Sequence, residues 1–311
     1  MPKPVYRPFA TIVFAAALSA GAMALPDTAN AQNSGDSAPS AGRQEGPVIA
    51  DPVPATPAIL AGRTYADLVD LAQRSPVVAK AVIHRQSRLK IEQSPGLPAG
   101  FARLYIEADT AGVLVGPELG ESLRLLADVP LNANGKVPKL VKTPVLLFGN
   151  VVSGKPGELL LTASDTIFAW SPALEARMRA ILTELVDPDA PPRITGLREA
   201  LHVPGNLAGE GETQFFFATD SGKPVSISVV RRPGEAPRWG VSFGEIVDQA
   251  ARPPHPETLA WYRLACALPD TIPGAAAIST GAANKRIAAE DYALILRDLG
   301  PCRRMRPTRT P

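Results

Sequence analysis

Residues 77–89, VVAKAVIHRQSRL, decide how the first half of the chain folds. Every second residue at the start of this stretch is small or apolar, and the positions between these residues include Lys80 and His84. A period of two together with β-branched residues predicts a strand. Residues 94–100 are rich in Pro and Gly and predict a loop, and residues 101–108 predict the next strand.

Further strands are expected at 122–128, 145–152 and 158–163. The turn 153–157 (SGKPG) favours a hairpin between the last two of them. Helices are expected at 65–73, capped by Thr64, and at 173–185, after Ser171-Pro172. Five short strands with a long middle loop predict a small, partly closed antiparallel barrel. Over residues 76–170 this pattern resembles OB-type barrels, such as the netrin-like modules of exported proteins. The first predicted domain covers 63–187.

The second predicted domain, 192–302, follows a Pro-rich break at 187–192. It reads as a β-meander followed by a pair of C-terminal helices, with strands at 214–219, 224–231 and 239–247 and helices at 257–268 and 284–299. The expected class is therefore α+β. Taken whole, the chain resembles uncharacterised exported proteins of Gram-negative bacteria, a resemblance that implies no activity.

Composition excludes several classes of protein. The 311 residues are 45% hydrophobic, which is too apolar for a wholly disordered chain. The 32 basic and 30 acidic residues give a formal charge of +2, too balanced for a general nucleic-acid binder. Two cysteines and three histidines are too few for a multi-cysteine metal site, so no metal or cofactor is expected.

The N-terminal residues predict export. Lys3 and Arg7 precede an apolar run at 9–25, and Ala29-Asn30-Ala31 is typical of a cleavage site before Gln32. Residues 1–31 are therefore a predicted signal peptide, after whose removal no transmembrane segment remains. An uncleaved membrane anchor is the alternative. Residues 32–62, rich in Pro and Ala, predict a disordered linker. The expected location is periplasmic or secreted.

Three motifs bear on catalysis. Gly240-Val241-Ser242-Phe243-Gly244 matches the G-x-S-x-G of serine hydrolases and makes Ser242 a weak nucleophile candidate. Its only downstream partners in hydrolase order, Asp248 and His255, follow too closely in sequence, and an ordinary strand explains the motif better. Residues 149–155 match most of a phosphate-binding loop, but Pro156 stands at the position where the motif requires a hydroxyl. Ser87-Arg88-Leu89-Lys90 matches the S-x-x-K motif of serine enzymes, but it lies on a predicted strand.

The three histidines, His84, His202 and His255, lack metal-ligand spacing and are interpreted as satisfied or solvent-facing side chains. Residues 303–311 form a basic tail, expected to be solvated, with anionic lipids or acidic polymers as alternative contacts.

Cys266 and Cys302 are the only cysteines, and an oxidising compartment favours their pairing in an intramolecular disulfide. Free thiols or a bond between two chains are the alternatives. The leading functional hypothesis is a non-enzymatic envelope or secreted module that binds an unknown envelope protein or polymer. A serine hydrolase using Ser242 and a purely structural envelope component are the competing hypotheses.

Overall fold

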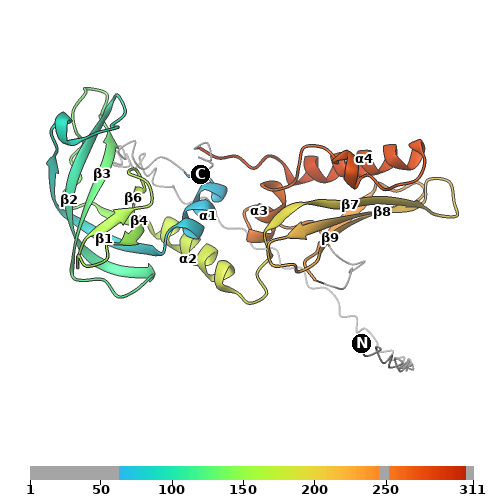
Figure 1. Ribbon diagram of the computed structural model, residues 1–311, viewed down its shortest axis with the longest axis horizontal. Coiled ribbons are helices and arrows are strands. Elements are labelled where there is room, and N and C mark those ends of the chain that lie inside the picture. Colours follow the sequence, from blue (N-terminus) through green and yellow to red (C-terminus); the bar gives the residue numbers. More distant parts are fainter. Residues whose placement is uncertain (1–62, 245–251, 306–311) are drawn as a thin grey trace, which may run out of the picture. The chain divides into compact units, whose positions relative to one another are not determined.

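The computed structural model describes residues 63–244 and 252–305, all within the unit Pro54–Pro311. The described part is an α+β protein with two antiparallel sheets, of six and four strands, and four α-helices (Figure 1). The α+β class and the two groups of strands agree with the sequence-based prediction.

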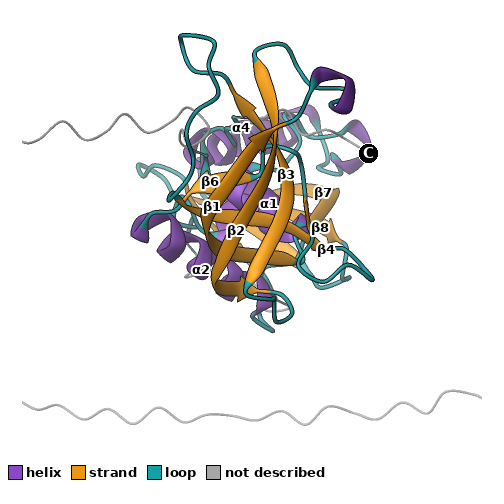
Figure 2. Cartoon of the chain, turned by 90° about the vertical axis from the view of Figure 1, so that its left-hand side faces the viewer, coloured by secondary structure: helices purple, strands orange, loops and turns teal. Residues whose placement is uncertain are grey.

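The six-stranded sheet has the order β3-β2-β1-β4-β5, with β6 paired to β4, and β1, β2 and β3 run side by side in Figure 2. Strand β2 is longer than predicted, and β6 was not predicted because it is only three residues long. The strands are β1 (Val77–Arg88), β2 (Phe101–Val115), β3 (Ser122–Pro130), β4 (Pro144–Val151), β5 (Leu159–Leu161) and β6 (Ile167–Ala169).

This sheet is not closed into a barrel within the described residues, so that part of the prediction is wrong. Its two end strands do approach each other, since Asp128 N donates to Ser164 O over 2.6 Å and Arg124 N to Gly157 O over 2.7 Å. They share only one isolated parallel bridge, between Arg124 and Glu158. β5 ends after three residues and is too short to form a closing ladder with β3.

Two hydrophobic clusters make the core, and β1 and β4 contribute to both. One cluster is built by strands β1–β6 together with Leu140. The other joins Val78, Leu146 and Phe148 of the same sheet to the four-stranded sheet and to the helices. Because β4 buries residues on both of its faces, its sequence PVLLFGNV is mostly apolar without alternation.

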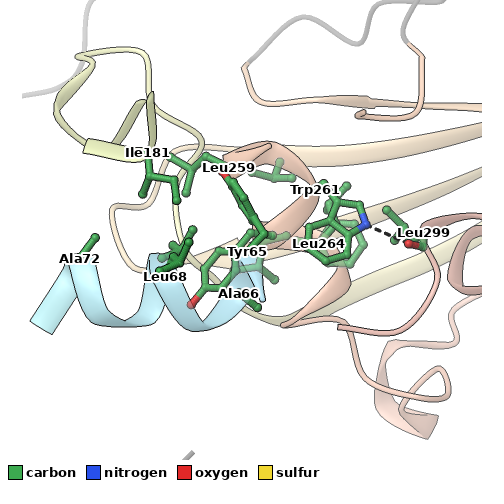
Figure 3. Packing of buried hydrophobic residues seen from close by; sticks show 14 of the residues in the cluster. Tyr65, Ala66, Leu68, Ala72, Ile181, Leu259, Trp261, Leu264 and Leu299 are labelled. Carbon is green, nitrogen blue, oxygen red and sulfur yellow. Dashed lines mark hydrogen bonds between the residues drawn. The ribbon is translucent and has the colours of Figure 1, made fainter. Parts of the chain in front are cut away.

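Helix α1 (Tyr65–Arg74) begins as predicted, with a capping box in which Thr64 and Asp67 each bond the other's backbone N–H. Helix α2 (Pro172–Val186) has Ser171 as its N-cap and proline in its first turn. Residues of α1, α2 and α3 (Leu259–Ala265) share the second core cluster (Figure 3). The Trp261 indole donates to Leu299 O over 2.8 Å, which satisfies its polar edge inside this cluster.

The four-stranded sheet has the order β10-β9-β8-β7, with strands β7 (Ile194–Pro204), β8 (Gly211–Thr219), β9 (Val225–Arg231) and β10 (Arg238–Ser242). Three of these strands were predicted and β7 was missed. β7 has register shifts between Ile194 and Gly196 and between Leu197 and Glu199. Such shifts interrupt the period of two on which the prediction depended.

Helix α4 (Ala282–Leu299) packs along the four-stranded sheet and ends at Gly300, whose φ of 68° is easily adopted only by glycine. Cys266, the C-cap of α3, is bonded to Cys302 beyond the end of α4, with Cα atoms 5.0 Å apart. The predicted disulfide is therefore present. It joins the ends of the two C-terminal helices.

The predicted signal peptide, including the Ala31–Gln32 cleavage position, and the linker 32–62 lie outside the described residues. Among the residues that are described, no helix is both long and apolar enough to cross a membrane. The basic tail is described only to Met305.

Candidate functional site

Ser242 lies at the end of strand β10, paired with Ser226 of β9, and residues 245–251, which would supply the helix of a strand-to-helix elbow, lie outside the described residues. Trp239 is buried, and Val241 and Phe243 pack against the same core, which is the alternation of a strand with one face buried. Asp248 lies outside the described residues, and His255 is exposed on a loop. The backbone conformation of 240–242 is thus that of an ordinary edge strand.

The other two motifs are also parts of strands. Residues 149–155 run from β4 into the turn of the β4–β5 hairpin, as predicted, so that no helix N-terminus faces the turn. Ser87 lies on β1 and Lys90 follows that strand, so the two side chains do not have the helical spacing that S-x-x-K chemistry needs.

The histidines occupy three different environments. Both ring nitrogens of His84 face carboxylates, at 2.9 Å from Asp109 and 3.5 Å from Glu107. His202 is buried, and His255 is exposed. Across 63–244 and 252–305, no group of three or more His, Cys, Asp or Glu side chains is placed to hold a metal ion.

His202 belongs to a buried polar network that sequence reasoning missed. Its Nδ1 lies 2.8 Å from Thr213 Oγ1, and this hydroxyl donates to Asp291, which also pairs with Arg231 at 2.6 Å. Burial lowers the pKa of His202, with Arg231 acting in the same direction and Asp291 opposing it. The residues of this network come from β7, β8, β9 and α4 and join these elements. Thr213 and Asp291 are wholly buried, so neither side chain is accessible to a substrate.

A row of three side chains, the half-buried Tyr105 and two exposed leucines, crosses the outer face of the six-stranded sheet. Tyr105 on β2 is directly opposite Leu126 on β3. The neighbouring residues of each strand, such as Leu104 and Leu125, point the other way into the core. Leu126 is 47% exposed although it lies in mid-strand. Alternation along a strand predicts a polar residue at such a solvent-facing position. A leucine there is therefore a candidate contact residue.

Leu160 extends this row onto β5. The bridge between Arg124 and Glu158 is parallel, so the next outward-facing residues of the two strands are Leu126 and Leu160. Leu160 is 64% exposed, while Leu159 and Leu161 on either side of it are buried. We call Tyr105, Leu126 and Leu160 the apolar row.

Charged residues flank the apolar row on both sides. On one side the charges alternate in sign across β1, β2, β3 and the residue before β5, and Arg85 lies 3.6 Å from Glu107; the four residues are Arg85, Glu107, Arg124 and Glu158. Arg85 pairs with Glu107, while Arg124 donates to Pro156 O and Glu158 pairs with Lys155, so these charged side chains form a polar border beside the apolar row.

On the other side, Arg103 donates two hydrogen bonds to Asp128, over 2.7 and 2.9 Å. The Arg103 guanidinium lowers the pKa of this buried carboxyl, and the carboxylate in turn raises the pKa of Arg103. The pair is therefore charged and fixed in place beside the row.

The signal for the apolar row in the sequence is weak. Each residue is one apolar letter within a strand, and the three lie far apart along the chain. Only the strand register brings them into one row, and that register was not predicted.

Comparison with known protein families finds no matching family, and comparison with curated proteins finds no significant relative.

Proposed function

We propose that this protein is an exported, non-enzymatic binding module that contacts a partner protein of the cell envelope or the secreted milieu through the apolar row. The observation that carries the proposal is the exposure of Leu126 and Leu160 in a regular sheet whose other side is a packed core. Burying these side chains against a partner would remove apolar area from water, the main favourable contribution to association.

The charged residues on either side support a specific contact rather than indiscriminate adhesion. Protein interfaces commonly have an apolar centre and a polar rim, and the rim selects partners by charge complementarity. Here the rim includes side chains already paired within the sheet, Arg103 with Asp128 and Arg85 with Glu107. Little side-chain entropy is then lost on binding.

The strand order supports the OB-type resemblance as part of this proposal. Order β3-β2-β1-β4-β5, with β3 and β5 meeting in parallel, is the connectivity of an OB-type fold that is left open at this edge. In OB folds the face of strands 2 and 3 is a common ligand surface, and Tyr105 and Leu126 lie on those strands here.

Export to the periplasm or the medium is part of the proposal as well. It is supported by the N-terminal sequence and by the Cys266–Cys302 disulfide, a bond that persists in oxidising compartments.

Site-specific photocrosslinking in the native cell tests the binding surface. A photoreactive residue replaces Leu126 in one variant and Leu160 in another, with Leu207 as the matched control because it is 63% exposed but belongs to the loop between β7 and β8. We expect the first two variants to form the same crosslinked species, absent from the control. Binding of that species to the purified protein should then fall at least about tenfold in Leu126→Glu, since a charge would be buried in the interface.

Failure of both positions to crosslink above the Leu207 control would contradict the proposal. A species shared equally by all three positions would contradict it too, because it would indicate unspecific contact.

A further inference from the structure

The disulfide borders an accessible depression at the ends of the two C-terminal helices. The depression has a volume of about 550 Å³ and includes both cysteines in its wall, together with Leu268, Asp270 and Arg297. Both cysteines are half-buried. A small thiol can therefore approach the bond from solvent, and the one carboxylate and one guanidinium of the wall give no strong net charge to oppose it.

The two sulfur atoms have different surroundings. Nη1 of Arg304 lies 3.1 Å from Sγ of Cys302. Cys266 is instead the C-cap of α3, where the helix presents carbonyl oxygens, and no described residue other than its disulfide partner contributes a polar side-chain contact to its sulfur. Cys302 also follows the C-terminus of a helix, α4, so the helix carbonyl oxygens do not distinguish the two sulfur atoms, and the Arg304 cation favours negative charge at Cys302 over Cys266.

Arg304 is held in this position by other contacts. Its Nε donates to Asp70 Oδ2 over 2.7 Å, and its guanidinium lies 5.9 Å from the ring centroid of Tyr262. The pair with Asp70 raises the pKa of Arg304, so the side chain is a permanent cation beside the disulfide. This anchoring also departs from the expectation of a solvated basic tail.

We propose that Cys266–Cys302 is a directional thiol-exchange site, at which an external thiolate attacks Cys266 and Cys302 leaves as a thiolate beside Arg304. A bond forms between the attacking sulfur and Sγ of Cys266, the Cys266–Cys302 bond breaks, and its electron pair passes to Sγ of Cys302. Exchange is faster through the leaving group that better carries negative charge.

A dithiol oxidoreductase of the same compartment is the class of partner that completes the reaction. Its second thiol attacks the mixed disulfide, Cys266 leaves as a thiolate, and the dithiol is oxidised to a disulfide while the protein is reduced by two electrons. The chain beyond α4 is then held to α1 by Arg304–Asp70 and by Met305 N, which donates to Asp67 Oδ2 over 3.0 Å. The new thiolate competes with Asp70 for Arg304, so reduction weakens the first of these contacts.

The experiment treats the purified oxidised protein with reduced glutathione for a short time, followed by acid quenching, alkylation of free thiols and peptide mass spectrometry. We expect glutathione on Cys266 and the alkyl group on Cys302, in at least about tenfold excess over the reverse product. Arg304→Gln should abolish most of this preference. Arg303→Gln is the matched control, because it removes the same charge from an exposed neighbouring side chain and should leave the preference unchanged.

Glutathione mainly on Cys302, an even distribution, or no exchange without denaturant would each overturn the proposal. Equal effects of the two arginine variants would overturn the role of Arg304. The wild-type distribution is decisive by itself if Arg304→Gln proves unfolded by circular dichroism.

Discussion

The two sheets obtain their cores in different ways. The six-stranded sheet builds one hydrophobic cluster almost entirely from its own strands. The four-stranded sheet shares its cluster with helices α1, α2, α3 and α4, which lie on both sides of it in the sequence. It also contains a buried polar network centred on Asp291, whereas the charged pairs of the six-stranded sheet lie on its outer face.

The two sheets should therefore lose stability under different conditions. A sheet that encloses its own apolar core loses little when a remote segment is changed. A sheet that depends on distant helices and on a satisfied buried carboxylate is sensitive to any change that removes one partner of that carboxylate.

The largest expected effect is that of Asp291→Ala. Asp291 is fully buried and pairs with Thr213 and Arg231, so its removal leaves the Thr213 hydroxyl without its acceptor and Arg231 with only the more distant Glu290. We expect the free energy of unfolding to fall by about 4 kcal/mol. Amide exchange in β8 and β9 should accelerate more than in β2 and β3. Glu290→Gln is the control, since Glu290 is 54% exposed and also lies near Arg231, and a loss of similar size there would contradict the reasoning.

Replacement of both cysteines by serine ranks next. The two cysteines are 36 residues apart in sequence, for which chain entropy gives a stabilisation of at most about 4 kcal/mol. Urea unfolding of the double variant, beside wild-type protein under oxidising and reducing conditions, measures this effect. The reduced wild type should match the double variant, and a difference of less than about 0.5 kcal/mol between oxidised and reduced protein would refute a stabilising role.

As the pH falls, the four-stranded sheet should lose stability before the six-stranded sheet does. The pKa of His202 is lowered from its ordinary 6.5, mainly by burial, so the unfolded chain binds the proton first. The four-stranded sheet should lose stability as pH falls below about 6.5. The pKa of Asp128 is lowered from 3.8 by Arg103, so the stability that this pair gives the six-stranded sheet persists until pH falls below that value.

Hydrogen exchange of the two sheets between pH 7 and pH 4 checks this order. His202→Gln should remove the slope near pH 6, while His255→Gln, at an exposed loop position, should leave it unchanged. An equal slope in both sheets would contradict the assignment.

Ser242→Ala should have the smallest effect, no more than about 1 kcal/mol in unfolding free energy, as expected at the end of an edge strand. A fluorophosphonate probe should not label Ser242 in the folded wild type. Labelling at this serine, lost in the variant, would restore the hydrolase hypothesis.

Local signals account for the parts of the fold that the sequence predicted. Thr64 with Asp67, Ser171 with Pro172, and Gly300 act within a few residues, and each determines a helix end. The disulfide was predictable because two cysteines allow one internal connectivity.

Features that depend on register or on distant contacts were not predictable in the same way. β7 was missed because its register shifts break the alternation. The barrel did not close because β5 is short, which its sequence does not show. The apolar row requires the alignment of Tyr105, Leu126 and Leu160 on three strands, and the contact of Arg304 with Asp70 joins residues 234 positions apart.

That last contact has a consequence for the time at which the protein becomes fully folded. Asp67 and Asp70 of the first helix receive hydrogen bonds from Met305 and Arg304, which are synthesised more than 230 residues later. Contacts so distant along the chain form late, because a long loop must close before they are made. Helix α1 can form its N-terminal cap early, but Asp67 and Asp70 gain these later hydrogen bonds only after residues 302–305 have been synthesised. A chain whose last contacts form in this way stays incompletely folded until its final residues have been synthesised.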